Sequence, residues 1–458
     1  MTSFVSIDPS TGERIASYPA MDAHQIDRAL DAARSAFAAW QRAPIAERVA
    51  PLRRAAELLE AGADAYALLM AREMGKPLKE GRAEIQKCAS VCRYYAQEAA
   101  GMLADEPRPS DAGRSYVSHR PLGVVLGIMP WNFPFWQAIR YCAPTLAAGN
   151  TVLLKHAPSV TGCALALEDL WREAGLPAGG FQTLRAEVDK VPAVIADPRV
   201  AAVSLTGSSR AGRSVAAAAG AALKPCVLEL GGSDPALILA DADLELAVEQ
   251  CTVGRMINGG QSCIATKRII VSRSLRAAFE EALRARLARM RVGDPRDEAT
   301  EVGPMAREDL RDHLARQVAA SIAAGAACPL GGKAPAGAGW YYPVTLLTDP
   351  RPESPACREE LFGPVATLVE AADEEEAIRL ANATTYGLGA AVYSRDLARA
   401  EAIARERLEA GTAFVNAFVR SDPRLPFGGT KDSGWGRELG REGLLAFTSA
   451  KTVWVAQA

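Results

Sequence analysis

The sequence lacks a strong excess of charge of either sign. Its 458 residues carry 52 Lys and Arg against 54 Asp and Glu, for a formal net charge of -2. Acidic and basic residues are also interspersed along the chain. Recognition of a nucleic acid or a membrane surface by bulk electrostatics is therefore not expected, and we predict a small-molecule ligand.

Long hydrophobic runs are missing as well. Residues 1–15 contain no apolar core of signal-peptide length, and no later run approaches the length that spans a bilayer. These absences predict a cytoplasmic protein with no membrane partner.

Cysteines are present but follow no paired spacing. The chain has nine, an odd number, which fits reduced thiols better than a disulfide scaffold. Cys88 and Cys92 have no histidine or second cysteine pair nearby, so we interpret them as helix core. No metal site is predicted.

The order of the expected elements indicates two α/β domains. The chain is longer than one hydrophobic core usually supports. Strand-like runs at 122–129, 151–155 and 200–205 alternate with helical segments, and the alternation restarts at Pro235. Such alternation is typical of βαβ units with parallel sheets.

A candidate nucleophile follows the helix expected over 243–256. In the segment Asn258–Cys263 two glycines loosen the backbone and end that helix, which would place Cys263 on an exposed turn. The alternative is a small buried hydrophobic residue, as we expect for the other eight cysteines. The motif by itself leaves both interpretations open.

A candidate polar group follows the buried strand at 122–129. Pro134 can open a helix that continues through Ala148, which would leave Asn132 at a strand-to-helix junction with its amide free. On such a helix, Trp136 and Arg140 follow at i+4 and i+8 and point the same way as Asn132. A capping role for Asn132 is the alternative.

Glu229 lies inside an apolar strand that ends in two glycines. Burial would raise the pKa of this carboxyl toward the range useful for a general base. A glutamate held by structural hydrogen bonds is the alternative.

A weak phosphate signal follows the strand at 200–205. Gly207, Ser208 and Gly212 open a helix there, so backbone amides and the helix N-terminus could face a phosphate, although the spacing is not the usual dinucleotide fingerprint. Lys155, at the end of its own strand, could reach the same cofactor. A surface lysine is the alternative.

Several segments, in family order, strongly resemble the aldehyde dehydrogenase superfamily over essentially the whole chain. They are Pro130–Pro134, Leu228–Gly232, Gly260–Cys263 and Glu360–Pro364. At a finer level the chain resembles bacterial NAD(P)-dependent succinate semialdehyde dehydrogenases, in Lys155–Pro158, Gly231–Pro235 and Ser421–Arg424.

The resemblance implies an α/β architecture of two Rossmann-like parallel-sheet domains plus a small β oligomerisation segment. It implies a dinucleotide-binding domain over 1–109 and 124–229 and a catalytic domain over 230–436. The oligomerisation segments would be 110–123 and 437–458. They contain β-type runs at 115–120 and 452–455, which in this family pair across subunits, so a homodimer or tetramer is expected.

The resemblance also assigns roles to the candidate residues. The Cys263 thiolate would attack an aldehyde, with the oxyanion held by the Asn132 amide and the Cys263 backbone N–H, and Glu229 would activate the hydrolytic water. Glu360 and Phe362 would position the nicotinamide ribose and ring. For a substrate with a carboxylate, we expect Arg140 as the cation, Trp136 as an apolar wall, and Ser262 and Ser421 as further donors. Arg140 paired with a structural acid is the alternative.

The cofactor choice depends on one position. Many family members carry a glutamate three residues after the lysine that matches Lys155, where this chain has Pro158. Without that acid, Lys155 and Ser159 could meet a phosphate, so both NAD and NADP are expected to bind, in no ranked order. The expected reaction is oxidation of succinate semialdehyde to succinate through a thiohemiacetal and a thioester.

Other activities stay open at this point. They are oxidation of another semialdehyde acid such as glutarate semialdehyde, a broad aliphatic aldehyde dehydrogenase, a CoA-acylating enzyme and a non-catalytic binding protein. The presence of Glu229 argues against CoA acylation, because such enzymes characteristically lack the hydrolytic glutamate.

Overall fold

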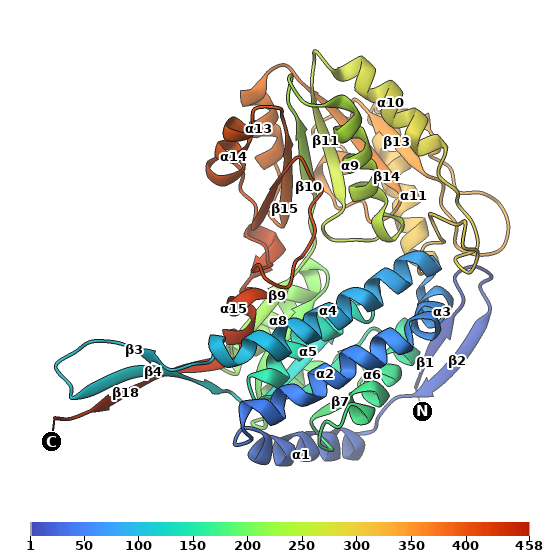
Figure 1. The fold of residues 1–458 in the computed structure, drawn as a ribbon. Coiled ribbons are helices and arrows are strands. Elements are labelled where there is room, and N and C mark those ends of the chain that lie inside the picture. Colours follow the sequence, from blue (N-terminus) through green and yellow to red (C-terminus); the bar gives the residue numbers. More distant parts are fainter. Residues whose placement is uncertain (1, 458) are drawn as a thin grey trace.

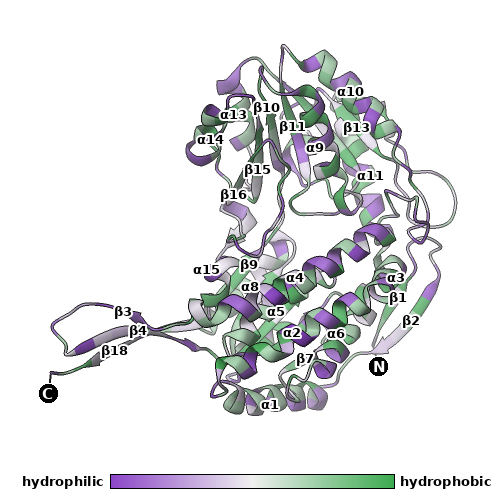
Figure 2. Ribbon diagram, in the orientation of Figure 1, coloured by the Kyte–Doolittle hydropathy of each residue, from purple (hydrophilic) through white to green (hydrophobic). Residues whose placement is uncertain are grey.

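The computed structural model describes residues 2–457. Two helix-covered sheets form the body, and a narrow β-sheet projects from one side (Figure 1). Figure 2 shows hydrophobic strands inside each half and hydrophilic residues on the outer helices. The predicted α/β class is confirmed. Within residues 2–457, no helix combines the length and the apolar character needed to cross a membrane.

The first sheet has six strands in the order β17-β9-β8-β5-β6-β7. All neighbours are parallel except β17 and β9. The strands with continuous apolar runs are buried on both faces, as such runs predict. The strands are β5 Val124–Met129, β6 Thr151–His156, β7 Phe181–Thr183, β8 Val200–Thr206, β9 Cys226–Glu229 and β17 Gly434–Trp435.

Helices cover both faces of this sheet. One face packs against α2, α4, α5 and α6, and the other against α1, α7 and α8. The hairpin of β1 (Ser3–Ile7) and β2 (Arg14–Pro19) lies at the N-terminus. The helices are α1 Ala23–Trp40, α2 Ile45–Ala61, α3 Ala63–Met74, α4 Leu78–Met102, α5 Trp136–Ala147, α6 Thr161–Glu173, α7 Val191–Ala196 and α8 Ser209–Ala221.

The second sheet has seven strands in the order β12-β13-β14-β11-β10-β15-β16, parallel except for β12 and β13. Its strands are β10 Asp234–Ile238, β11 Thr266–Ser272, β12 Ala327–Leu330, β13 Thr345–Thr348, β14 Val365–Ala371, β15 Gly389–Tyr393 and β16 Thr412–Val415.

Helices also cover both faces of the second sheet. One face packs against α9 and α10, and the other against α13 and α14. The helices of this half are α9 Leu244–Met256, α10 Arg276–Ala288, α11 Glu308–Ala323, α12 Pro355–Arg358, α13 Glu374–Asn382 and α14 Leu397–Glu406.

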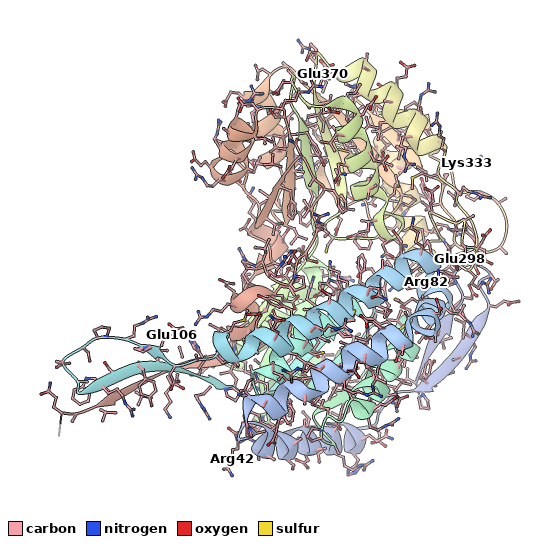
Figure 3. All side chains as sticks on the ribbon, viewed as in Figure 1. Arg42, Arg82, Glu106, Glu298, Lys333 and Glu370 are labelled. Carbon is pink, nitrogen blue, oxygen red and sulfur yellow. The ribbon has the colours of Figure 1, made fainter. Side chains whose placement is uncertain are left out.

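The halves meet along α4. There Arg82 forms two hydrogen bonds with Glu298, at 2.7 and 2.8 Å, and these residues lie side by side in Figure 3.

The projecting sheet contains β3 (Glu106–Pro107), β4 (Arg114–Pro121) and β18 (Thr448–Val455). The runs predicted at 115–120 and 452–455 therefore pair with each other, antiparallel, within one chain. Pairing across subunits stays a prediction.

The segment that contains β17 and α15 departs from the predicted domain limits. Helix α15 (Gly440–Leu445) packs against α4 and α5 on the body, and β17 joins the first sheet. The chain therefore already returns to the first half at β17, before the predicted boundary at residue 436. It stays there through α15 until it reaches β18. The two-domain division itself stays a prediction.

Candidate active site

The turn that presents Cys263 is built from left-handed backbone. Helix α9 is capped by Asp243, whose side chain accepts a hydrogen bond from the Leu246 N–H at 3.1 Å, and the helix ends at Met256. Asn258, Gly259 and Gly260 then take φ values of 56°, 60° and 73°. These conformations turn the chain so that Cys263 lies partly exposed. The predicted turn is present, but the helix already breaks at the extended Ile257, so the prediction that the two glycines end the helix is wrong.

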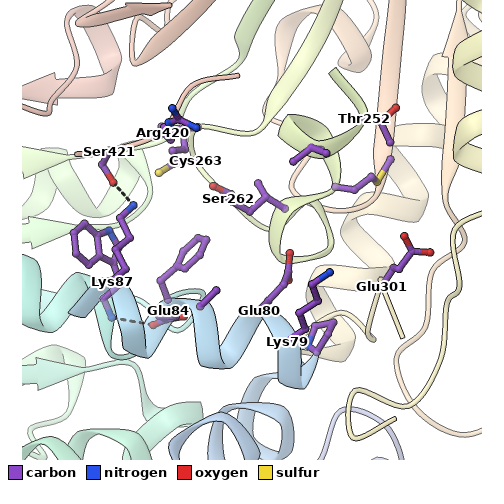
Figure 4. Close-up of a pocket in the computed structure, with 18 of the residues that line it drawn as sticks. Lys79, Glu80, Glu84, Lys87, Thr252, Ser262, Cys263, Glu301, Arg420 and Ser421 are labelled. Atoms are coloured by element: carbon purple, nitrogen blue, oxygen red, sulfur yellow. Dashed lines mark hydrogen bonds between the residues drawn. The ribbon is translucent and has the colours of Figure 1, made fainter. Parts of the chain in front are cut away.

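Cys263 faces a cavity of about 560 Å³ between the two halves of the molecule (Figure 4). Residues from α4, α5, α9, α10 and the segments 298–301 and 420–427 also line it. Each of the four residues predicted to bind substrate lines this cavity together with Cys263, namely Trp136, Arg140, Ser262 and Ser421. Whether they bind substrate stays a prediction.

Asn132 lies in the turn between β5 and α5, and it is not on the helix. Helix α5 begins only at Trp136, because Glu84 accepts the backbone N–H groups of Phe135 and Trp136 and fixes the helix start there. The predicted helix from Pro134 is therefore wrong at its first turn, and Asn132 and Arg140 do not share a helical face.

The prediction of a free Asn132 amide is also wrong. Its Nδ2 donates to the Gln261 carbonyl at 2.9 Å, which ties this turn to the loop of Cys263. Asn132 is 3% exposed and is absent from the residues that line the cavity. Because a side-chain amide has two N–H groups, one donor is left for an oxyanion.

Glu229 lies at the end of β9 with 2% of its surface exposed. Neither of its carboxylate oxygens has a hydrogen-bond partner within the described part of the chain. Burial raises the pKa of this carboxyl well above its usual value, and the neighbouring Glu438 raises it further, while Arg140 and Arg437 oppose the rise. The predicted rise in pKa is confirmed, and the role as a general base stays a prediction.

Burial and nearby cations act in opposite directions on the thiol of Cys263. Burial raises its pKa to about 11, and Lys267 and Arg140 oppose this rise. Lys267 donates to the carbonyls of Ser262 at 2.7 Å and Cys263 at 2.5 Å. Lys267 was not singled out from the sequence, because it lies near the start of strand β11 and belongs to no motif.

Arg140 has an acidic partner in the structure. It is 2% exposed, its guanidinium pairs with Glu438 through Nε, and its Nη2 donates to the Thr206 hydroxyl at 3.2 Å. The alternative of a structural ion pair is therefore what the structure shows, although Arg140 also lines the cavity.

Another cation on the cavity wall, Lys87 on α4, was missed from the sequence. Its Nζ donates to the Ser421 hydroxyl at 2.7 Å and lies 4.3 Å from the centroid of the Trp136 ring. Burial, and then repulsion from Arg140, lower its pKa to about 8. No ion pair of Lys87 is found among residues 2–457. The sequence feature that could have identified it is its position three residues after Glu84, because this spacing puts two charges on one helical face. The helix had been interpreted as a packing helix only.

Four of the residues predicted to bind the dinucleotide lie at or just after the carboxyl ends of β6 and β8, namely Lys155, Ser159, Gly207 and Ser208. This edge of a parallel sheet is where such ligands bind. Burial lowers the pKa of Lys155 at the end of β6. Ser159 lies on the short 3-10 helix Pro158–Val160, and its buried hydroxyl is without a hydrogen-bond partner in the described chain, so it can serve a ligand.

The groups of the glycine segment after β8 are less available to a phosphate than predicted. The Gly207 N–H donates to the Glu229 carbonyl at 3.0 Å, and the Ser208 hydroxyl caps α8. Gly212 lies one turn inside α8, where its N–H donates to the Ser208 carbonyl at 2.9 Å and a side chain would collide with Leu230. The prediction that Gly212 offers its amide to a phosphate is wrong, because the helix uses that amide and packing explains the glycine.

Glu360 and Phe362 lie on the other side of the nucleophile loop. Glu360 accepts the Gly232 N–H at 3.1 Å, and its carboxylate is 3.3 Å from Lys267 Nζ. Phe362 meets Trp131 edge to face, with 5.8 Å between ring centroids. In the part of the chain the structure describes, no group of three His, Cys, Asp or Glu residues is placed to hold a metal ion.

The fold and this site define the class of protein. Residues 1–453 match the model of the aldehyde dehydrogenase family, and the chain belongs to that family. Among solved structures it is similar to the succinic semialdehyde dehydrogenase from Streptococcus pyogenes in complex with NADP+. That structure has a TM-score of 0.97 and 35% sequence identity, over 99% of this chain and 100% of the other.

Two relatives share close to half of their aligned residues with this chain. The NAD(P)+ succinate semialdehyde dehydrogenase Sad of Escherichia coli (strain K12) is 47% identical over 453 residues, which cover 99% of this chain and 98% of that protein. The NADP+ succinate-semialdehyde dehydrogenase of Mycolicibacterium paratuberculosis is 48% identical over 457 residues, with 98% and 96% covered.

Proposed function

We propose that this enzyme oxidises succinate semialdehyde to succinate with NAD or NADP. The observation that carries the proposal is a cavity with Cys263 on its wall and cationic side chains on the same wall, among them Lys87 and Arg140. A cation without an acidic partner, such as Lys87, favours an aldehyde that also bears a carboxylate. The names of the relatives support the same substrate.

The carboxylate is expected to bind Lys87, whose charge has no acidic partner among residues 2–457. Ser421, already in contact with Lys87 at 2.7 Å, supplies a hydroxyl donor. Arg140 uses its Nε and Nη2 for Glu438 and Thr206, which leaves Nη1 for a ligand. The face of Trp136 supplies an apolar wall for the methylene groups.

The chemistry begins at Cys263. Its sulfur attacks the aldehyde carbon to form a thiohemiacetal, and the developing oxyanion accepts hydrogen bonds from the second Asn132 N–H and the Cys263 backbone N–H. The nicotinamide, when bound, supplies the hydride acceptor that lets the thiohemiacetal become a thioester. Covalent catalysis thus divides one difficult oxidation into two steps.

Glu229 completes the cycle. As a carboxylate it takes a proton from a water molecule, whose oxygen attacks the thioester carbon. The carbon–sulfur bond breaks, the carboxylic acid leaves, and the proton returns to the Cys263 sulfur. Because burial raises the pKa of Glu229, this base becomes more available as the pH rises.

The cofactor site supports either dinucleotide. Pro158 places no carboxylate beside the ribose, so a 2′-phosphate meets no like charge there. The amine of Lys155 and the unpartnered hydroxyl of Ser159 are suitable donors for that phosphate. We expect catalytic efficiencies with NAD and NADP to differ by less than about a hundredfold, or roughly 2.7 kcal/mol.

A five-carbon homologue is the second candidate substrate. The cavity of about 560 Å³ is within the range of ligand pockets and has room for one more methylene than succinate semialdehyde contains. Glutarate semialdehyde would keep both the aldehyde and the carboxylate contacts.

The assembly and location are part of the same proposal. We expect a homodimer or a tetramer built through the sheet of β3, β4 and β18, acting in the cytoplasm. The projection of this sheet away from the body supports an intermolecular contact (Figure 1).

The test is a comparison of catalytic efficiencies on succinate semialdehyde, glutarate semialdehyde and butanal, with each cofactor. Butanal has the same number of carbons as succinate semialdehyde but no carboxylate. We expect succinate semialdehyde to exceed butanal by at least about tenfold, the value of one charge-assisted contact. Equal efficiencies on these two aldehydes would contradict the proposal, and a higher efficiency on glutarate semialdehyde would favour the second candidate.

A further inference from the structure

Helix α4 contacts the nucleophile loop through Glu80. The Glu80 carboxylate accepts the backbone N–H of Asn258 at 2.8 Å. Asn258 is the first of the three residues with left-handed backbone that lead to Cys263. Asparagine tolerates this conformation better than most residues other than glycine, and the Glu80 contact fixes it here.

The same helix contacts the Asn132 turn one helical turn later. One Glu84 oxygen accepts the N–H groups of Phe135 at 2.9 Å and Trp136 at 2.8 Å. The other oxygen pairs with Lys76, whose Nζ lies 4.0 Å from the centroid of the Phe133 ring. Glu84 therefore holds the segment that follows Asn132.

Asn258 joins the two loops to each other. Its Nδ2 donates to the Asn132 carbonyl at 2.7 Å and to the Gln261 carbonyl at 3.0 Å. The Asn132 Nδ2 donates to the same Gln261 carbonyl at 2.9 Å. The path from α4 through Glu80, Asn258 and Asn132 therefore returns to α4 along the backbone to Phe135, whose N–H Glu84 accepts.

We infer that Glu80 and Glu84 are positioning residues that set the Asn132 amide relative to Cys263 from one rigid helix. Neither residue touches the reacting atoms in this role. The inference rests on the proposed function, since it takes Asn132 as the oxyanion donor and Cys263 as the nucleophile. A donor must lie about 3 Å from the developing oxyanion to act, and a displacement of about 1 Å can cost about a hundredfold in rate.

Glu80 is the better residue to vary. Glu84 is paired with a fully buried lysine, so its removal would leave a buried charge alone. Glu80 forms no ion pair among the residues described, and only one of its oxygens has a hydrogen-bond partner there. Glu80→Met removes the acceptor for Asn258, whereas Glu80→Gln keeps an acceptor of the same length. Glu98→Met, on the same helix but away from the cavity, is the matched control.

The measurement is the rate of the first burst of NAD(P)H with saturating succinate semialdehyde. We expect Glu80→Met to slow the burst by about 10- to 100-fold. Glu80→Gln and Glu98→Met should stay within about threefold of wild type, since each keeps an acceptor for the Asn258 N–H. Alkylation of Cys263 by iodoacetamide, which uses no oxyanion donor, should change by less than about threefold in all these variants.

A double-mutant cycle separates alignment from general stability. In an Asn132→Ala background, where the donor is absent, adding Glu80→Met should slow the burst by less than about threefold further. A fully multiplicative effect in the double variant would overturn the inference, as would a burst in Glu80→Gln as slow as in Glu80→Met. The proposed function fails separately, if Cys263→Ala or Asn132→Ala keeps the wild-type burst.

Discussion

Replacing Lys87 with methionine removes the cation that we place against the substrate carboxylate and keeps an unbranched side chain against Trp136. The substitution deletes a charge-assisted hydrogen bond in a partly buried site, where the ammonium already touches Ser421 at 2.7 Å. Hydrogen bonds to charged groups contribute about 1.5 to 3 kcal/mol. Catalytic efficiency on succinate semialdehyde should therefore fall by roughly 10- to 150-fold.

The assay is steady-state kinetics of Lys87→Met on succinate semialdehyde and on butanal, with the same cofactor. Butanal makes no hydrogen bond with the cation, so its efficiency should change by less than about threefold. Lys79→Met is the control, since Lys79 is exposed at the rim of the same cavity on the same helix. It should leave both substrates nearly unchanged.

Arg140→Ala provides the contrast. This change also breaks the buried pair with Glu438 beside Glu229, so the efficiency should fall on both substrates. Equal decreases on both substrates in Lys87→Met would refute the assignment of Lys87, and no decrease on either would do the same.

The remaining predictions concern pH, the second half-reaction and assembly. Lys87 has a pKa of about 8 and carries its charge below that pH, so the ratio of catalytic efficiencies on succinate semialdehyde and butanal should fall as pH rises through about 8. The ratio cancels the titration of enzyme groups that act on both substrates alike. A ratio independent of pH between about 7 and 9 would therefore argue against this role. Glu229→Gln should keep the first burst of NAD(P)H and slow turnover by about 10² to 10⁴, the usual contribution of a general base. Abolition of the burst as complete as in Cys263→Ala would contradict that assignment. Light scattering at micromolar concentration should show a dimer or a tetramer, and a stable active monomer would refute the proposed assembly.

The parts of the site that depend on local sequence could be predicted. The glycines after Asn258 permit left-handed backbone at low cost, so the turn at Cys263 follows from neighbouring residues. The buried strands β5 and β6 likewise follow from continuous apolar runs. The raised pKa of Glu229 follows from its place inside such a strand.

The parts that depend on distant partners could not be predicted. Helix α5 starts at Trp136 because Glu84, far away in sequence, accepts its first N–H groups. Arg140 meets Glu438, which arrives from near the other end of the chain. Lys87 resembles a solvent-facing residue of a packing helix until α4 is placed against the 420–427 segment. In each case tertiary packing, which periodicity does not reveal, selects the partner.

The most direct test of the account is to find the atom that carries the substrate. Glu229→Gln enzyme is mixed with succinate semialdehyde and NAD or NADP, quenched in acid after one turnover, digested and mapped by mass spectrometry. The account predicts one succinyl group on the peptide that contains Cys263, since acylation proceeds while hydrolysis lacks its base. NAD(P)H formed in one equivalent without acylation of Cys263, or with the acyl group on another residue, would contradict it.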